Sequence, residues 1–145
     1  MENNPHIKNE FKAEDKTLPF KGPEAIDAEC LECFEYEYAD QPVGDMSIVT
    51  STDEFTSVCP FSGLPDFAEV SLEYVPDRLC VELRSYKYYL MSYRDVGIWY
   101  EHLVNRMLDD LVKAIQPKSM TVTVACNPRG GLASTVTASW PRQEK

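Results

Sequence analysis

An apolar stripe along residues 99–115 constrains the fold of this chain more than any other feature of its sequence. Its members recur three or four residues apart: Tyr100, Leu103, Val104, Met107, Leu108, Leu111, Val112 and Ile115. This spacing places all of them on one face of an α-helix, which Pro117 ends. A similar stripe over residues 85–93, followed by Gly97, predicts a second helix directly before the first.

Strand patterns flank this pair of helices on both sides. In each segment apolar side chains alternate with polar ones, or Thr and Val predominate, as in half-buried strands. The candidates are residues 34–38, 46–50, 67–75, 79–82, 120–126 and 132–140, with turns at 76–77 and 127–131. Strands, two consecutive helices and strands again predict an α+β fold, in which both helices cover one face of an antiparallel sheet.

The N-terminal part of the chain differs from the rest. A length of 145 residues indicates one domain. Residues 1–28, however, carry scattered lysines, acids and prolines and show no sustained periodicity. We therefore expect a flexible arm over residues 1–28, disordered or lying over a neighbouring copy, and a single domain over residues 29–145.

Composition narrows the partners and the compartment. The formal net charge of −10 argues against nucleic-acid binding, because binding to phosphates requires clustered Lys and Arg. A small molecule is a better partner, together with further copies of the chain in a homo-oligomer. No segment has the pattern of a signal peptide or a membrane span. Five cysteines, an odd number, are typical of reduced thiols in the cytoplasm.

One cysteine lies in an unusual segment. Residues 55–67 hold two prolines and a glycine around Cys59 and Asp66, which predicts an ordered turn rather than a ladder strand. A nucleophilic thiol needs a base or a positive field, but His6 belongs to the arm and His102 to the charged face of the long helix. Asp66 is then the available proton carrier. The same residues also fit a small buried cysteine and a strand cap.

The basic residues 84, 87 and 94 have no acid between them, which is unusual in so acidic a chain. Arg84, Lys87 and Arg94 would share one flank of a helix and could bind a phosphorylated small molecule. Arg129 could add a fork of hydrogen-bond donors, and the two glycines after it would let the phosphorylated molecule approach the backbone closely. A solvated helix face is the alternative interpretation.

Two glutamates have a similar ambiguity. Glu82 ends a strand, and Glu101 lies on the shoulder of the apolar stripe, where we expect a semi-buried, paired carboxylate. A carboxylate matches the paired N–H donors of a purine-like ring, but a helix-start glutamate favoured by the macrodipole fits equally well. Cys30 and Cys33 form a lone C-x-x-C without a second ligand pair, so we expect no metal site.

Three segments match the pattern of one known family: residues 54–67 around Cys59, residues 82–89 (Glu-Leu-Arg-Ser-Tyr-Lys-Tyr-Tyr) and residues 127–131 (Asn-Pro-Arg-Gly-Gly). Over residues 54–140 the chain resembles the NADPH-dependent 7-cyano-7-deazaguanine reductases, the nitrile reductases of queuosine biosynthesis, in their short single-module form. The resemblance implies the tunnelling fold (T-fold), a four-stranded antiparallel sheet backed by two antiparallel helices. Subunits would join into an oligomeric barrel, with sites between neighbours and two pentamers stacked as a decamer.

The resemblance also implies a role for each matching residue. Cys59 would attack the nitrile carbon to form a covalent thioimide, Asp66 would donate the proton, and two NADPH would complete the reduction to the primary amine. The substrate-binding residues would be Val81, Glu82, Leu83, Tyr100 and Glu101. The cofactor-binding residues would be Arg84, Ser85, Lys87, Arg129 and Gly130.

Two positions depart from the family pattern, and two other functions stay open. The family usually has lysine where Arg84 stands, but arginine keeps the charge. It usually has histidine where Tyr100 stands, and tyrosine donates a hydrogen bond without titrating near neutral pH. Similar archaeal proteins add ammonia to the same nitrile, forming an amidine without NADPH, although residues 82–89 favour the reductase. A non-catalytic T-fold module would instead bind a purine or pterin through Glu101.

Overall fold

The central feature of the fold is a four-stranded antiparallel sheet with the strand order β2-β3-β5-β6. Its strands are β2 (Ile48–Val58), β3 (Pro65–Val75), β5 (Ser119–Cys126) and β6 (Thr135–Trp140). A second, two-stranded sheet pairs β1 (Cys33–Glu35) with β4 (Leu79–Val81). The helices are α1 (Leu83–Met91) and α2 (Tyr100–Ile115). This computed structural model describes residues 4, 7, 16–42 and 44–143.

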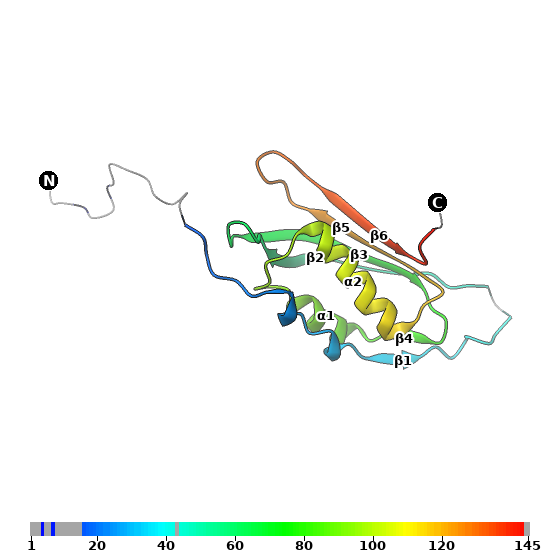
Figure 1. The fold of residues 1–145 in the computed structure, drawn as a ribbon. Coiled ribbons are helices and arrows are strands. Elements are labelled where there is room, and N and C mark those ends of the chain that lie inside the picture. Colours follow the sequence, from blue (N-terminus) through cyan, green and yellow to red (C-terminus); the bar gives the residue numbers. More distant parts are fainter. Residues whose placement is uncertain (1–3, 5–6, 8–15, 43, 144–145) are drawn as a thin grey trace.

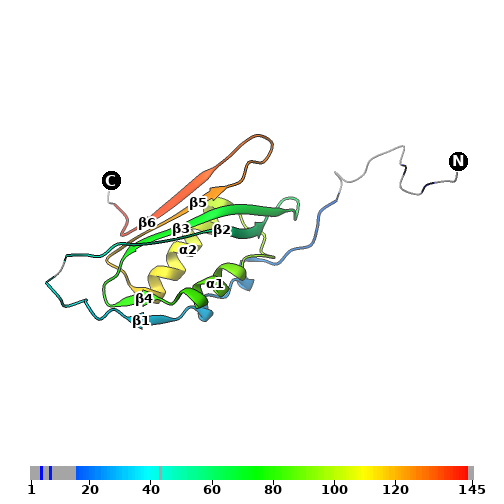
Figure 2. The same cartoon turned by 180° about the vertical axis from the view of Figure 1, so that it is seen from behind.

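The core lies between the helices and one face of the sheet. α2 lies in front of the sheet in Figure 1 and behind strands β2 and β3 in Figure 2. Every second residue of β3 and β5 is buried, and the apolar stripe of α2 packs against them. The fully buried side chains here include Val70, Leu72, Val122, Val124, Leu103, Met107, Leu111 and Ile115. The predicted α+β class, with both helices on one face, is confirmed.

β2 is the element that differs most from its prediction. The sequence indicated a short strand over residues 46–50, but β2 has eleven residues and continues to Val58. Its pairing with β3 shifts register between Thr52 and Phe55, at a β-bulge. A bulge interrupts the two-residue alternation, which hid the second half of the strand in the sequence. β1 and β6 are shorter than predicted, at Cys33–Glu35 and Thr135–Trp140.

Residues 18–30, which we call the strap, pack against the domain instead of forming a free arm. The Lys21 amide donates to the Asp95 carbonyl (2.7 Å), and the Gly97 amide donates back to the Lys21 carbonyl (2.9 Å). Two short 3₁₀ helices follow, η2 (Pro23–Ala25) and η3 (Ala28–Cys30), and Ile26 joins the core. The prediction of a flexible arm is therefore wrong for residues 18–28. Backbone hydrogen bonds hold this segment, and such bonds leave no periodic pattern in the sequence from which order could be predicted. Residues 1–3, 5–6 and 8–15 lie outside the described part.

A buried polar network joins the two helices. The Tyr89 hydroxyl donates to Asp110 Oδ2 (2.8 Å), and Arg106 Nε donates to the same oxygen (2.7 Å). The hydroxyls of Tyr89 and Tyr93 are 2.8 Å apart, and burial raises the pKa of both. Each buried hydroxyl is thus a neutral, satisfied donor, so the network fixes α1 relative to α2 without an unpaired group.

Replacing Asp110 by alanine should lower the free energy of unfolding by roughly 2 kcal/mol, because Tyr89 and Arg106 lose their common acceptor. Urea denaturation measures the change. Asp109→Ala is the matched control on the same helix, since Asp109 makes only an exposed ion pair with Lys113 (2.8 Å). That variant should lose less than about 0.5 kcal/mol. Equal losses in the two variants would show that the network adds nothing to stability.

Candidate active site

Cys59 is the first residue after β2, at the start of a short turn into β3. Its amide donates to the Leu64 carbonyl (2.9 Å), and the Gly63 amide donates to the Cys59 carbonyl (2.8 Å). Gly63 has φ of 74°, a conformation that glycine adopts without steric cost. The predicted ordered turn exists, but it covers residues 59–64 only. The prediction was wrong for the rest of residues 55–67, which belong to β2 and β3.

Backbone hydrogen bonds hold this turn from two sides. On one side, the Leu18 amide of the strap donates to the Ser62 carbonyl (3.0 Å). On the other, the Val58 amide donates to the Val96 carbonyl (2.9 Å), and the Ile98 amide donates to the Val58 carbonyl (3.2 Å). Cys59 therefore follows a strand end whose position is fixed by segments distant in sequence.

Gly63→Ala should loosen the strap and reduce stability by roughly 1–3 kcal/mol. A Cβ at this position would clash with the Leu18 carbonyl oxygen, and the positive φ strains any other residue. Urea denaturation would give the stability, and limited proteolysis would show faster cleavage within the strap. Gly44→Ala is the control, because a Cβ there meets nothing within 4 Å. Indistinguishable stability of the two variants would contradict the role given to this contact.

The Cys59 thiol is only 5% exposed, yet it is the most acidic of the cysteines. Burial acts to raise its pKa. Hydrogen bonds from the Ser62 hydroxyl, the Ser62 and Phe61 amides and the Arg129 guanidinium outweigh burial and lower the pKa to about 7. About half of the thiol is then thiolate at neutral pH. Burial instead raises the pKa of the other thiols, Cys30, Cys33, Cys80 and Cys126.

Asp66 enters the same site from β3, opposite Ser57 in the ladder. Its side chain is buried, and burial raises the pKa of the carboxyl although the Arg129 charge and the Tyr100 hydroxyl oppose the shift. A carboxyl with a raised pKa retains its proton closer to neutral pH and can donate it. The pKa values of Cys59 and Asp66 thus move toward each other, as proton exchange between an acid and a nucleophile requires.

Arg129 covers this pair from the loop between β5 and β6. Its Nη1 lies 3.0 Å from Asp66 Oδ1, an ion pair that lacks the alignment of a hydrogen bond. Its guanidinium carbon lies 5.4 Å from the ring centroid of Tyr100, and hydrogen bonding of the guanidinium to the Cys59 thiol raises the pKa of Arg129. Gly130 has φ of 56°, which lets the loop turn back sharply. The residue expected on the cofactor is therefore in contact with both reactive groups.

Unsatisfied polar atoms concentrate at this site. Ser57 Oγ, Asp66 Oδ1 and Tyr100 Oη are buried without a hydrogen-bond partner, and they are three of the four such side-chain atoms in the described residues. A buried polar group without a partner is costly, so native proteins seldom keep one unless a ligand or water completes it. The sequence did not indicate Ser57, because the bulge in β2 obscured which residues of that strand face inward.

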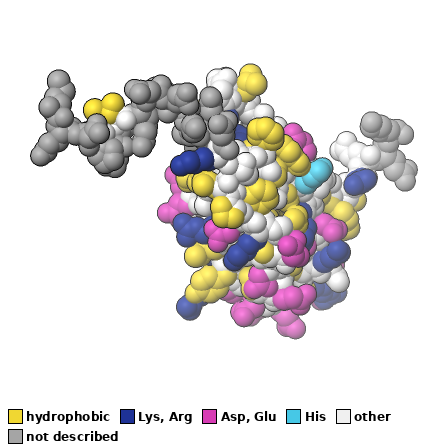
Figure 3. Space-filling model, turned by 60° about the vertical axis from the view of Figure 1, so that its left-hand side comes forward, with side chains coloured by type: hydrophobic (Ala, Val, Ile, Leu, Met, Phe, Trp, Pro, Cys, Tyr) yellow, Lys and Arg dark blue, Asp and Glu magenta, His cyan; other side chains and the backbone are white. Residues whose placement is uncertain are grey.

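Tyr100 and Glu101 begin α2 beside the pair. Tyr100 is half-buried, and Glu101 is exposed, with no partner for its carboxylate among the described residues. The expectation of a semi-buried, paired Glu101 was wrong, because no other element covers its side of the first helical turn. Figure 3 looks toward this end of the molecule, where apolar side chains gather on the surface. Exposed apolar residues of this end include Phe61, Leu64 and Trp99.

The other predicted substrate residues lie at the junction of β4 and α1, away from Cys59. Val81 is buried and Leu83 is exposed. The Glu82 carboxylate caps α1 by accepting hydrogen bonds from two backbone amides of the first turn (2.8 and 2.7 Å). These hydrogen bonds lower the pKa of Glu82. Figure 1 shows the β4–α1 junction and the β2–β3 turn at opposite ends of the molecule. The structure does not bring Glu82 and Cys59 of one chain together.

The predicted cofactor residues on α1 have different environments. Arg84 is exposed and lies over the ring of Tyr88, 5.7 Å from its centroid. Lys87 makes an ion pair with Glu54 (2.6 Å), a partner that the sequence did not suggest. Ser85 is buried, and its hydroxyl donates to the Glu82 carbonyl (2.8 Å), so it stabilises the helix start. Only Arg84 and Lys87 therefore present their polar ends to solvent.

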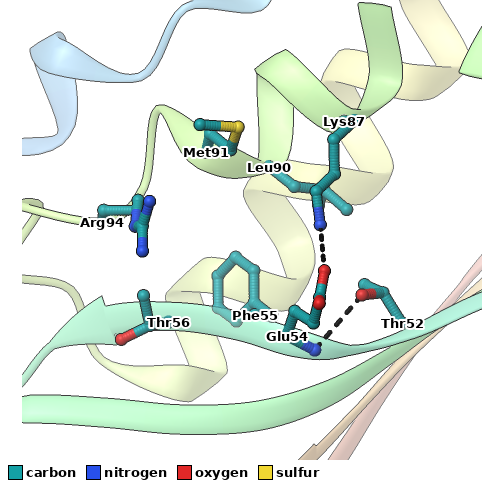
Figure 4. Close-up of a pocket in the computed structure, with 8 residues that line it drawn as sticks. All are labelled: Thr52, Glu54, Phe55, Thr56, Lys87, Leu90, Met91 and Arg94. Atoms are coloured by element: carbon teal, nitrogen blue, oxygen red, sulfur yellow. Dashed lines mark hydrogen bonds and ion pairs between the residues drawn. The ribbon is translucent and has the colours of Figure 1, made fainter. Parts of the chain in front are cut away.

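A cavity of about 310 Å³ separates α1 from β2. Figure 4 shows Lys87 and Arg94 on one side of it and Glu54 and Thr56 of β2 on the other. Arg94 was expected on the same helical flank as Arg84 and Lys87, and this prediction was wrong. α1 ends at Met91, so Arg94 lies after the helix. The Arg94 guanidinium has no partner among the described residues. The cavity thus carries a free cation beside a paired one.

Two negative findings concern metals and membranes. Among the residues with described positions, no group of three or more His, Cys, Asp or Glu side chains could hold a metal ion. Within the same part of the chain, neither α1 nor α2 has the length and apolar character needed to cross a bilayer.

Comparison with known proteins identifies the family. The family described as QueF-like protein matches residues 65–145. The NADPH-dependent 7-cyano-7-deazaguanine reductase of Chlorobium phaeovibrioides is 52% identical over 115 residues, 79% of this chain and 97% of that protein. The enzyme of the same name from Caldanaerobacter subterraneus is 46% identical over 133 residues, covering 92% and 97%. This chain belongs to the QueF-like family.

A solved structure of a QueF-Like protein has the same fold. The archaeosine synthase QueF-Like in its apo form matches with a TM-score of 0.59 and 29% identity, over 68% of this chain and 95% of that one. The predicted T-fold, with four antiparallel strands and two helices on one face, is therefore confirmed. The resemblance to the reductases of this family, drawn from residues 54–67, 82–89 and 127–131, is confirmed as well.

Proposed function

We propose that this chain is an NADPH-dependent 7-cyano-7-deazaguanine reductase, which reduces the nitrile of that base to the primary amine in queuosine biosynthesis. The Cys59–Asp66 pair carries the proposal, since a buried thiol with a pKa of about 7 lies near a buried carboxyl with a raised pKa. Relatives named for this reaction are about half identical to the chain. All five cysteines are free thiols, which fits a reducing cytoplasm.

In the first step, Cys59 acts as the nucleophile. The sulfur electron pair forms a bond to the nitrile carbon, and one π pair of the C≡N bond moves to the nitrogen. The Asp66 carboxyl gives its proton to that nitrogen, which leaves a thioimide on Cys59. The Ser62 hydroxyl and amide hold the sulfur while the bond forms.

The basic residues around α1 fit a cofactor with several phosphates. Arg84 is exposed, Arg94 is unpaired among the described side chains, and Lys87 can exchange Glu54 for a phosphate oxygen. Gly130 and Gly131 leave open space beside the Arg129 loop, where a phosphate can approach the backbone. When bound, NADPH supplies the hydride, and the four-electron reduction uses two of them. Ser85 would act indirectly, by holding the first turn of α1.

A second copy of the chain would complete the substrate site. Tyr100, which contacts Arg129, and Glu101 begin α2, whereas Glu82 precedes α1 at the other end of the molecule, so one chain offers only half of the ring-binding residues near Arg129. β2 and β6 are the two edges of the sheet, and apart from the pairing of Val58 with residues 96–98 no strand in the described part of this chain covers their outer sides. Pairing of these edges would close a barrel of subunits and bring Glu82, with Val81 and Leu83, to a neighbouring Cys59. Two stacked pentamers would then make the decamer.

Supplying NADPH and 7-cyano-7-deazaguanine tests the proposed reaction. We expect NADPH absorbance to fall until two NADPH are used for each nitrile, with the aminomethyl product identified by mass. Added ammonium should change neither the rate nor the product. Absence of NADPH oxidation under these conditions would refute the reductase assignment.

The likeness to archaeosine synthase supports one alternative. An amidine-forming enzyme could use the same thioimide, with ammonia in place of hydride. The structural match at a TM-score of 0.59 favours a common nitrile site but says nothing of the second reactant. Formation of an amidine with ammonium, in the absence of NADPH, would support this alternative.

A further inference from the structure

Arg129 touches every reactive group of the site at once. It forms an ion pair with Asp66 (3.0 Å), its guanidinium carbon lies 5.4 Å from the ring centroid of Tyr100, and it helps to lower the pKa of the Cys59 thiol. Its own side chain is 45% exposed, whereas that of Asp66 is 2% exposed. A cofactor-phosphate ligand has no need to reach two buried acidic groups, so its position suggests another role that would operate before NADPH binds.

Among the described residues, the two acids of the site have one compensating cation, Arg129. Cys59 and Asp66 are both buried, and each would carry a negative charge if ionised. A second negative charge would be buried without a counter-ion, which is strongly unfavourable. Tyr100 and Cys126 add no further negative charge near neutral pH, because burial raises the pKa of both, that of Cys126 to about 11, and Glu101 is exposed. One cation therefore permits one negative charge.

We propose that Arg129 keeps the Cys59–Asp66 pair singly ionised, so that the thiol and the carboxyl share one proton and one negative charge. This inference rests on the proposed function, because the addition step needs a thiolate and a protonated carboxyl at the same time. During addition, the sulfur loses its negative charge to the new C–S bond, and Asp66 becomes a carboxylate when its proton moves to the nitrile nitrogen. The total charge of the pair is unchanged, and Arg129 already contacts the group that becomes negative.

Alkylation of Cys59 by iodoacetamide tests this role, because it needs neither nitrile nor NADPH. The rate is followed against pH by peptide mass, which separates Cys59 from the other cysteines. Arg129→Met should raise the midpoint by about one pH unit from its wild-type value near 7 and slow alkylation at neutral pH about five-fold. Arg129→Lys keeps the charge and should stay nearer the wild-type profile. Arg78→Met, which removes an exposed ion pair with Asp40, is the neutral control.

A second readout separates thiol activation from cofactor binding. Formation of the nitrile adduct without NADPH should slow in Arg129→Met by a similar factor. In Arg84→Met it should proceed at the wild-type rate, although NADPH-dependent turnover falls. A wild-type alkylation midpoint in Arg129→Met would overturn the proposed role. If the wild-type chain is alkylated as described but never oxidises NADPH, the proposed function fails and the role of Arg129 still stands.

Discussion

Replacing Cys59 by alanine is expected to abolish nitrile-dependent NADPH oxidation, with a loss of at least about 10⁴-fold. No other described cysteine can take its place, because Cys59 alone has a lowered pKa, whereas burial raises the pKa of the other four. Initial rates at saturating NADPH measure the loss. The fold should remain, since a small side chain still fills the end of β2.

Cys33→Ala provides the control for this variant. Cys33 is exposed on β1, in the two-stranded sheet, and partial desolvation together with Cys80 raises the pKa of its thiol. Its removal should leave turnover within about two-fold of wild type. Comparable losses in both variants would point to a structural cause and would remove the special role of Cys59.

Replacing Asp66 by asparagine is expected to slow adduct formation about 10²–10⁴-fold while the nitrile still binds. The amide keeps the size of the side chain but has no acidic proton to give to the nitrile nitrogen. Glu69→Gln, on the exposed face of the same strand, is the matched control and should react like wild type. Unchanged adduct kinetics in Asp66→Asn would refute the role given to this carboxyl.

The pH dependence of adduct formation provides a second test of the role of Asp66. Its pKa is raised, so the acid form persists below that pKa and is lost as the pH rises through it. The thiolate of Cys59 is lost as the pH falls below about 7. The rate of adduct formation should therefore fall on both sides of an optimum, and the pair should titrate as a coupled unit. In Asp66→Asn the alkaline decline should disappear.

The sequence predicted the architecture well wherever one face of an element is buried. The stripe of α2 and the alternation of β3 are direct consequences of burial, and both were visible. β2 was recognised only in its first residues, because a bulge breaks its period. The strap over residues 18–30 was missed for a related reason, since it is held by backbone hydrogen bonds that any side chain permits.

The proposed reactive residues could be singled out from the sequence, but their geometry could not. Cys59 and Asp66 were candidates because prolines and a glycine between them require an ordered turn. The contact of Arg129 with Asp66 depends on the pairing of β5 with β3, which places the β5–β6 loop beside the start of β3 and which no local pattern encodes. The Lys87–Glu54 ion pair likewise joins residues 33 positions apart. Long-range pairing of this kind leaves no trace in residue spacing.

The mass of the intact protein after mixing with 7-cyano-7-deazaguanine, without NADPH, tests the central claim most directly. Addition of the thiolate to the nitrile retains every atom of both partners, so the protein should gain the full mass of the nitrile. The gain should be absent in Cys59→Ala and slow in Asp66→Asn. A wild-type protein that gains no mass while binding the nitrile, or an equal gain in Cys59→Ala, would contradict covalent catalysis by this cysteine.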